Sequence, residues 1–346
     1  MNFYTLTSKY KVYLSLILVA ISLVFINLII LFYIDGKTTK DSFIGSKFSK
    51  TKHYSLNNQT SKDIVFIGDS HTVFHISTNS FKDHGLDVYN LGVSGMHLEN
   101  FPFHIKHISD ANVKPKRIVL SFDIGTLYRD LAVSHYPTIT EIKLYYKVNK
   151  IKFFKSILQW IKSFNVFIQY SEAVFNKFES LYNSFKPVET IINNAQVNND
   201  LVDVDYSNLV GCNVFDIKHQ GHATILKCSN GDGILVGTVV EIETGVRNNK
   251  DLVNINQEVI KYLNSGISLA DESIEVIIVL SPKNVNDNIK YDLSRIKNHI
   301  KGAKVIDLTN YLINNDMRAD LSHFNNIGRE KYSSYLAHMF KQDISQ

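Results

Sequence analysis

Short apolar runs rich in β-branched residues recur along the chain, and they predict the strands of a buried sheet. Runs of this length without polar alternation are typical of strands covered on both faces, as in a parallel sheet. We expect five such strands, at residues 64–67, 86–91, 117–122, 274–280 and 304–308.

The segment between the last two predicted strands has a helical pattern. Its apolar positions are three or four residues apart, and Gly302 follows them as a helix-ending residue; the positions are Ile289, Leu293, Ile296 and Ile300. A strand, a helix and a strand in succession predict a parallel unit. The fold class is therefore α/β, with helices on both faces of a five-stranded parallel sheet. Ligands of such sheets bind beyond the carboxyl ends of the strands.

Residues 12–34 form an apolar stretch that predicts one transmembrane helix. The stretch carries no charge, and at ~1.5 Å per residue it is long enough to cross a hydrocarbon core of ~30 Å. A cleaved signal peptide would need a shorter apolar region and a small-residue site, which "FYIDGKTT" does not offer. Lysines flank both ends, so charge hardly discriminates the orientation. The free amino terminus favours a single-pass anchor with the following domain in the periplasm or outside the cell.

The composition of the chain predicts its division into parts. Residues 1–34 are a cytoplasmic tip and the anchor, the polar residues 35–60 are a linker, and residues 61–346 are an α/β domain with an insertion at about 126–270. The first part of the insertion is rich in lysine and aromatic residues and predicts one or two long helices, which either cap the sheet or rest on a bilayer surface. Its second part, residues 204–245, has short β-like runs broken by glycines.

The charge of the chain bears on its possible partners, and its cysteines bear on its compartment. The net charge is +4 and the lysines are spread without a dense block, so a nucleic acid partner is not expected. Cys212 and Cys228 lack a CxxC spacing. They would form a disulfide in an extracytoplasmic chain or remain two buried thiols, and the sequence leaves both alternatives open.

The first predicted strand ends in "IVFIGDSHT", which places Ser70 between a buried strand and a helix. A serine there has its hydroxyl at the edge of the sheet, and the start of the helix stabilises a developing negative charge. Serine is a weak nucleophile until a base removes its proton. "ADLSHFNN" supplies a candidate base, because a tight turn would let Asp320 orient His323. The alternative is that Asp320 or one of the following asparagines only caps the next helix and that His323 is an ordinary surface residue.

These residues resemble the SGNH (GDSL-like) esterase and acyltransferase superfamily in three blocks, "GDS", "NLGVSGM" and "DLSHFN". The resemblance implies a flavodoxin-like, three-layer α/β/α domain with Ser70 as nucleophile and His323 and Asp320 completing a triad. It also implies that the backbone N–H groups of Ser70 and Gly95 form an oxyanion hole. Membrane-anchored members of the family that act on envelope polysaccharides provide the nearest comparison.

One block departs from the family pattern. The family usually has Gly-x-Asn-Asp after the third strand, where the asparagine donates to the oxyanion, but this chain has "SFDIG" with Asp123. An ionised aspartate would repel an oxyanion, and losing one donor costs ~10²–10³ in rate. This departure argues against a free-standing lipase more strongly than it argues against an enzyme that transfers acyl groups.

Other polar residues near the blocks are candidate ligands. His71 and His75 have a helical metal-ligand spacing but lack a third ligand, and the Gly92 to Gly95 loop lacks a nucleotide-binding pattern, so neither a metal nor a cofactor is expected. The candidate substrate contacts are Asp69, His71, Asp123 and Arg129.

The sequence thus predicts a membrane-anchored serine esterase or O-acyltransferase, with O-acetyl transfer to an envelope polysaccharide favoured. Its expected partners are the polysaccharide, the bilayer and a membrane acyl-donor protein. The alternatives are a catalytically silent, glycan-binding assembly protein, an esterase that releases acyl groups to water, and a lipid esterase facing the cytosol.

Overall fold

The computed structural model describes scattered positions between Tyr10 and Phe25 and most of the chain from Lys47 onward. In that second part the described ranges are 47–57, 60–134, 136–163, 212–220, 223–237, 248–250, 254–284, 287–312 and 314–344. The chain divides into two compact units, residues 1–41 with 157–201, and residues 42–156 with 202–346. The sheet and the candidate site belong to the second unit.

Five parallel strands form the central sheet, in the order β2-β1-β3-β8-β10. Each predicted strand is confirmed to within two residues at either end. The strands are β1 (Ile64–Gly68), β2 (Val88–Asn90), β3 (Arg117–Phe122), β8 (Glu275–Leu280) and β10 (Lys304–Asp307).

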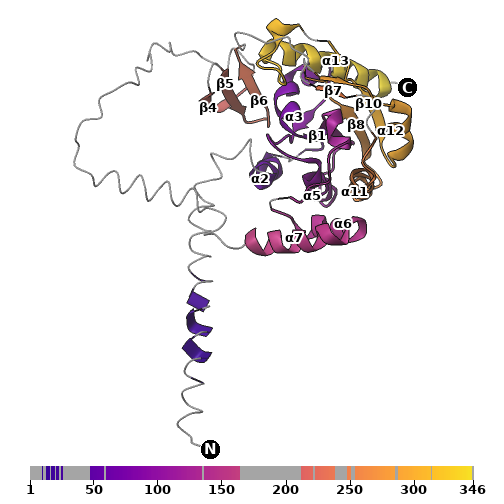
Figure 1. The fold of residues 1–346 in the computed structure, drawn as a ribbon. Coiled ribbons are helices and arrows are strands. Elements are labelled where there is room, and N and C mark those ends of the chain that lie inside the picture. Colours follow the sequence, from indigo (N-terminus) through magenta and orange to yellow (C-terminus); the bar gives the residue numbers. More distant parts are fainter. Residues whose placement is uncertain are drawn as a thin grey trace, which may run out of the picture. The chain divides into compact units, whose positions relative to one another are not determined.

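Helices cover both faces of the sheet, as predicted for an α/β fold. Successive strand residues point to opposite faces, so Val65 and Ile67 belong to one core cluster whereas Ile64 and Phe66 belong to the other. The first cluster is completed by α5 (Phe101–Ser109) and α11 (Gln257–Ile267), and the second by α4 (Thr78–Asp83) and α13 (Asn326–Ile344). Figure 1 shows α13 on one side of the sheet and α5 and α11 on the other.

The other helices are shorter or lie outside the sheet layers. They are α2 (Lys47–Asn57), α3 (Ser70–His75), α6 (Ile139–Val148), α7 (Lys150–Ser163) and α12 (Leu293–His299), with 3-10 turns η1 (Leu98–Asn100), η2 (Ile124–Leu127) and η3 (Asn315–Met317). The helix predicted before Gly302 is therefore shorter than expected. Ile289 lies instead in β9 (Asp287–Ile289), which pairs in parallel with β7 (Asn248–Lys250).

The insertion predicted at about 126–270 ends earlier than expected. Its last helix, α11, is the crossover between β3 and β8, and its apolar face packs in the main core with Val259, Tyr262 and Leu263. The lysine-rich part forms α6 and α7, and residues 164–200 lie outside the described residues. Because α6 packs on α5 and α11, it caps helices and not the sheet itself.

The linker predicted for residues 35–60 is wrong over its second half. Residues 47–57 form α2, whose Tyr54 is buried in the main core. The sequence of α2 is polar because its buried face is built partly from lysines, whose long aliphatic stems pack while their ammonium groups find remote partners. Lys47 pairs with Glu141 of α6 at 2.8 Å, with both side chains almost fully buried.

The glycine-rich part of the insertion forms a small antiparallel sheet, as its β-like runs predict. Its strands are β4 (Val214–Gln220), β5 (Ala223–Cys228) and β6 (Gly233–Val236). Cys212 and Cys228 form a disulfide, which resolves the alternative that the sequence left open.

The predicted anchor at residues 12–34 lies mostly outside the described residues. Its described positions, from Tyr13 to Phe25, are helical, and their large apolar side chains are more than half exposed. Among the described residues, no helix combines the length and the apolar character needed to cross a membrane.

Candidate active site

Ser70 lies at a tight junction between β1 and α3. Asp69 is the N-cap of α3, and its carboxylate accepts a hydrogen bond from the His71 backbone N–H at 2.9 Å. Gly68 is required just before it, because a Cβ there would collide with the Thr72 side chain and the Ser121 carbonyl. The junction therefore fixes Ser70 as the first residue of the helix at the carboxyl edge of the sheet.

His323 and Asp320 meet Ser70 at this edge although they are remote in the sequence. The Ser70 hydroxyl lies 2.8 Å from His323 Nε2, and His323 Nδ1 lies 2.8 Å from Asp320 Oδ2. Burial raises the pKa of Asp320, but its hydrogen bonds with the His323 ring and with backbone N–H groups outweigh burial and leave the pKa lowered. An ionised carboxylate only accepts, so His323 Nδ1 carries the proton and Nε2 is free to accept the Ser70 proton.

The turn that carries Asp320 and His323 is held by the same carboxylate. Asp320 Oδ1 accepts the backbone N–H groups of Ser322 at 2.7 Å and His323 at 2.8 Å. The cap on the following helix is made by Asn325, whose Oδ1 accepts the backbone N–H groups of Ile327 at 3.0 Å and Gly328 at 3.1 Å, whereas Asp320 bonds to the turn and to the imidazole. One side chain both shapes the turn and orients the ring.

The "NLGVSGM" block and the "SFDIG" segment lie beside Ser70. The Val93 backbone N–H donates to the Gly68 carbonyl at 2.9 Å, and on the other side of β1 Gly68 is in register with Ser121. Gly95 has a positive φ of 73°, a conformation that favours glycine. The loop that contains Gly95 and the residue Asp123 therefore flank Ser70 at the same edge.

Asp123 is buried and only half of its carboxyl group is paired. Its Oδ1 accepts the backbone N–H of Gly125 at 2.6 Å, whereas Oδ2 has no hydrogen-bond partner among the residues that the structure describes. Burial raises the pKa of Asp123, although His71 and Arg129 act in the opposite direction. Arg129, at the end of η2, is exposed.

Two further histidines pack around the triad. The His71 ring is centred 5.6 Å from the His323 ring, and its Nδ1 lies 3.3 Å from Asp69 Oδ1. Burial lowers the pKa of His71, but Asp69 and Asp123 outweigh it and leave the pKa raised. His75 stacks on Phe324 with ring centroids 3.9 Å apart. Within the described ranges, no group of three or more His, Cys, Asp or Glu side chains is arranged to hold a metal ion.

A pocket of about 360 Å³ opens along the loop that contains Gly95. Its lining combines aromatic rings with hydroxyl, amide and imidazole groups, a mixture suited to a polar organic substrate. The pocket is lined by Lys47, Phe48, Val93, Ser94, Gly95, Met96, His97, Glu99, Asn100, Ala132, Val133, Ser134 and Tyr136.

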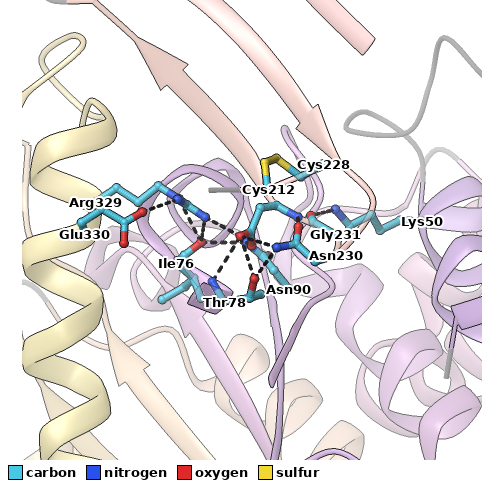
Figure 2. The surroundings of a disulfide bond; sticks show 11 residues. Lys50, Ile76, Thr78, Asn90, Cys212, Cys228, Asn230, Gly231, Arg329 and Glu330 are labelled. Atoms are coloured by element: carbon cyan, nitrogen blue, oxygen red, sulfur yellow. Dashed lines mark hydrogen bonds and ion pairs between the residues drawn. A yellow bond between two sulfur atoms is a disulfide. The ribbon is translucent and has the colours of Figure 1, made fainter. Parts of the chain in front are cut away.

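A buried polar network packs next to α3, the helix that begins with Ser70. The sequence alone did not predict this network. Asp232, in the turn between β5 and β6, pairs with Arg329 of α13 at 2.6 Å and accepts the Thr78 hydroxyl at 2.9 Å. Arg329 also donates to the Ile76 carbonyl that ends α3, at 2.8 Å. Figure 2 shows these contacts next to the disulfide, together with the bond from Lys50 to the Gly231 carbonyl.

Asn90 joins this network to the helix that begins with Ser70. Its side-chain N–H group donates to the carbonyls of Thr72 at 3.0 Å and Val73 at 3.2 Å, while its Oδ1 accepts the Gly92 backbone N–H at 3.0 Å. Asn90 therefore ties α3 to the start of the glycine loop. The only signal for this role in the sequence is an asparagine at a strand end just before a glycine.

Comparison with known proteins gives no match, either to a protein-family model or to a curated protein sequence. The chemistry of the site therefore has to be inferred from its own geometry.

Proposed function

We propose that the protein is a serine esterase or O-acyltransferase that uses Ser70, His323 and Asp320 as a catalytic triad. The observation that supports this most directly is the continuous chain of two 2.8 Å contacts from Ser70 Oγ through the His323 ring to Asp320. Nucleophile, base and orienting carboxylate come from opposite ends of the chain. A purely structural role for this partly exposed serine would not require such an arrangement.

The reaction follows from the order of the contacts. Ser70 Oγ attacks the acyl carbon of an ester while His323 Nε2 takes its proton, and the imidazolium then gives that proton to the departing alcohol. The backbone N–H groups of Ser70 and Gly95 stabilise the oxyanion. In the second half, His323 takes a proton from water or from a sugar hydroxyl, which attacks the acyl-serine and releases Ser70.

Fold and block order support membership of the SGNH superfamily. The strand order β2-β1-β3-β8-β10 corresponds to the 2-1-3-4-5 order of flavodoxin-like sheets, and the core clusters on its two faces fit a three-layer domain. The three sequence blocks lie at the carboxyl edge of this sheet. Asp123 is the position at which the chain departs from the family pattern.

The proposed substrate is an O-acyl group of an envelope polysaccharide, which lies outside the cytosol. The disulfide between Cys212 and Cys228 fits an oxidising, extracytoplasmic compartment. The apolar residues 12–34 fit a single-pass anchor that would keep the domain beside the bilayer and a membrane acyl donor. These two features favour transfer of an acetyl group to a glycan over release to water.

The unpaired carboxyl oxygen of Asp123 favours a second candidate, a catalytically silent protein that binds glycan in the same cleft. An ionised carboxylate would oppose an oxyanion but would accept hydrogen bonds from sugar hydroxyls. The two candidates differ in the reactivity of Ser70.

The test combines a chromogenic acetyl ester with fluorophosphonate labelling of the full chain. We expect wild-type protein to turn over the ester and to be labelled at Ser70, and Ser70→Ala and His323→Ala to lose turnover. Ser273→Ala is the matched control, because Ser273 lies next to the amino end of β8, at the opposite edge of the sheet. Equal turnover in all four proteins would contradict the proposal, and glycan binding without labelling would favour the silent protein.

A further inference from the structure

We propose that the Asp123 carboxyl is protonated in the resting protein and donates the third hydrogen bond of the oxyanion hole. The proposal rests on the function proposed above and identifies a further catalytic residue for it. In this role Asp123 supplies an O–H group where an asparagine would supply an N–H group.

The strand register places Asp123 next to Ser70. Gly68 of β1 is paired with Ser121 of β3, so Ser70 and Asp123 each follow this pair by two residues, just beyond the ends of two adjacent parallel strands. Neighbouring strands are about 4.8 Å apart. A side chain from Asp123 therefore starts within reach of an acyl oxygen bound at Ser70.

The hydrogen bonds of Asp123 leave one oxygen free for this role. Oδ1 is held by the Gly125 N–H at 2.6 Å, which fixes the orientation of the group. Oδ2 is buried and has no partner among the described residues. A buried ionised oxygen without a donor is costly, whereas a protonated one carries a hydrogen that an incoming oxyanion can accept.

The charges around Asp123 act in both directions: His71 and Arg129 favour the ionised carboxylate, whereas Asp69 favours the neutral acid. His71 faces it from α3, Asp69 caps the same helix, and Arg129 approaches from the end of η2. His323 lies beyond His71, with the two rings centred 5.6 Å apart. Since His71 Nδ1 lies 3.3 Å from Asp69 Oδ1, the His71 imidazole is shared with a second carboxylate. The neutral form is favoured by the burial of Asp123 and by its unpaired Oδ2.

The pKa of Asp123 is consistent with this arrangement. Burial raises it, His71, the Gly125 N–H and Arg129 lower it, Asp69 raises it again, and the net direction is upward. Proteins can hold a carboxyl group neutral in this way so that it donates a hydrogen bond to an oxyanion at neutral pH.

The first test compares two substitutions of Asp123 over a range of pH. Asp123→Asn keeps a donor of the same shape that cannot ionise, and we expect kcat/KM within about threefold of wild type at neutral pH. Asp123→Ala removes the donor, and we expect a loss of ~10²-fold. Wild-type activity should decline on the alkaline side as Asp123 ionises, and this decline should be absent from Asp123→Asn. Equal losses in both variants, or an unchanged alkaline decline in Asp123→Asn, would overturn the proposal.

The second test does not depend on turnover. Infrared spectra of protein labelled with ¹³C-aspartate should show a protonated carboxyl band at neutral pH that Asp123→Asn removes. Asp271→Asn is the control, because hydrogen bonds with Lys114 and Ser273 hold the pKa of that exposed carboxyl below its ordinary value. If Ser70 reacts with fluorophosphonate but the band is missing, only the role of Asp123 is overturned. If the band is present but Ser70 is inert, the proposed function and the donor role both fail.

Discussion

The catalytic edge and the network around Asp232 join the same two remote parts of the chain, but they use their polar groups differently. At the edge, Ser70 and His323 are partly exposed and Asp123 keeps an unpaired oxygen. In the network, Asp232 and Arg329 are almost fully buried and bond to several partners each. The polar groups of the network are paired with one another, whereas the edge that carries Ser70 leaves an oxygen of Asp123 without a partner among the described residues.

The largest expected effect comes from breaking the orientation of His323 without disturbing the turn. Asp320→Asn keeps the Oδ1 acceptor for the Ser322 and His323 N–H groups, but its amide would donate to His323 Nδ1 and select the wrong tautomer. We expect kcat for ester turnover to fall by about 10⁴-fold. The thermal melting temperature should stay close to that of wild type, and a fall in kcat of less than tenfold would contradict the proposed relay.

The opposite result is expected when the network is broken. Arg329→Leu leaves Asp232 as a buried carboxylate without its cation, which should lower the free energy of unfolding by ~3–5 kcal/mol in urea titrations. Because Arg329 also donates to the Ile76 carbonyl that ends α3, α3 should loosen and turnover should fall near the melting temperature. The double variant Arg329→Leu, Asp232→Leu removes both charges and should recover part of the loss. A single variant as stable as wild type would show that the pair does not hold the two parts together.

Lowering the pH is expected to have a smaller effect on the free energy of unfolding. The residue responsible is His75, which lies between the two regions. Burial, with His71, His323 and Arg318 nearby, lowers the pKa of His75 well below its ordinary value of 6.5. Below pH 6.5 the unfolded chain binds a proton that the folded chain does not, so stability should fall by up to ~1.4 kcal/mol per pH unit.

The pH effect is measured as the free energy of unfolding between pH 7 and pH 5. His75→Phe should reduce the slope because it keeps the stack on Phe324 and removes the titrating group. His338→Phe is the control, since His338 is exposed on α13. Equal slopes in wild type and His75→Phe would exclude His75 as the source.

The strands of the fold could be predicted because each is a local apolar run, and the triad could be predicted because its blocks are local motifs. The linker was predicted wrongly since the burial of Lys47 depends on Glu141, far away in the sequence. The ion pair between Arg329 and Asp232 could not be predicted for the same reason, because the two residues become partners only when α13 and the β5–β6 turn pack on α3. No spacing within the sequence encodes a contact of that kind.

The distance along the chain between Ser70 and its base has a consequence for biosynthesis. The two residues are separated by 253 positions, and His323 lies close to the carboxyl terminus. A growing polypeptide would thus present its nucleophile long before the group that activates it has been synthesised. Under the proposed mechanism, a chain that stopped before Asp320 would lack both the base and the carboxylate that orients it, and we expect it to be inactive on esters.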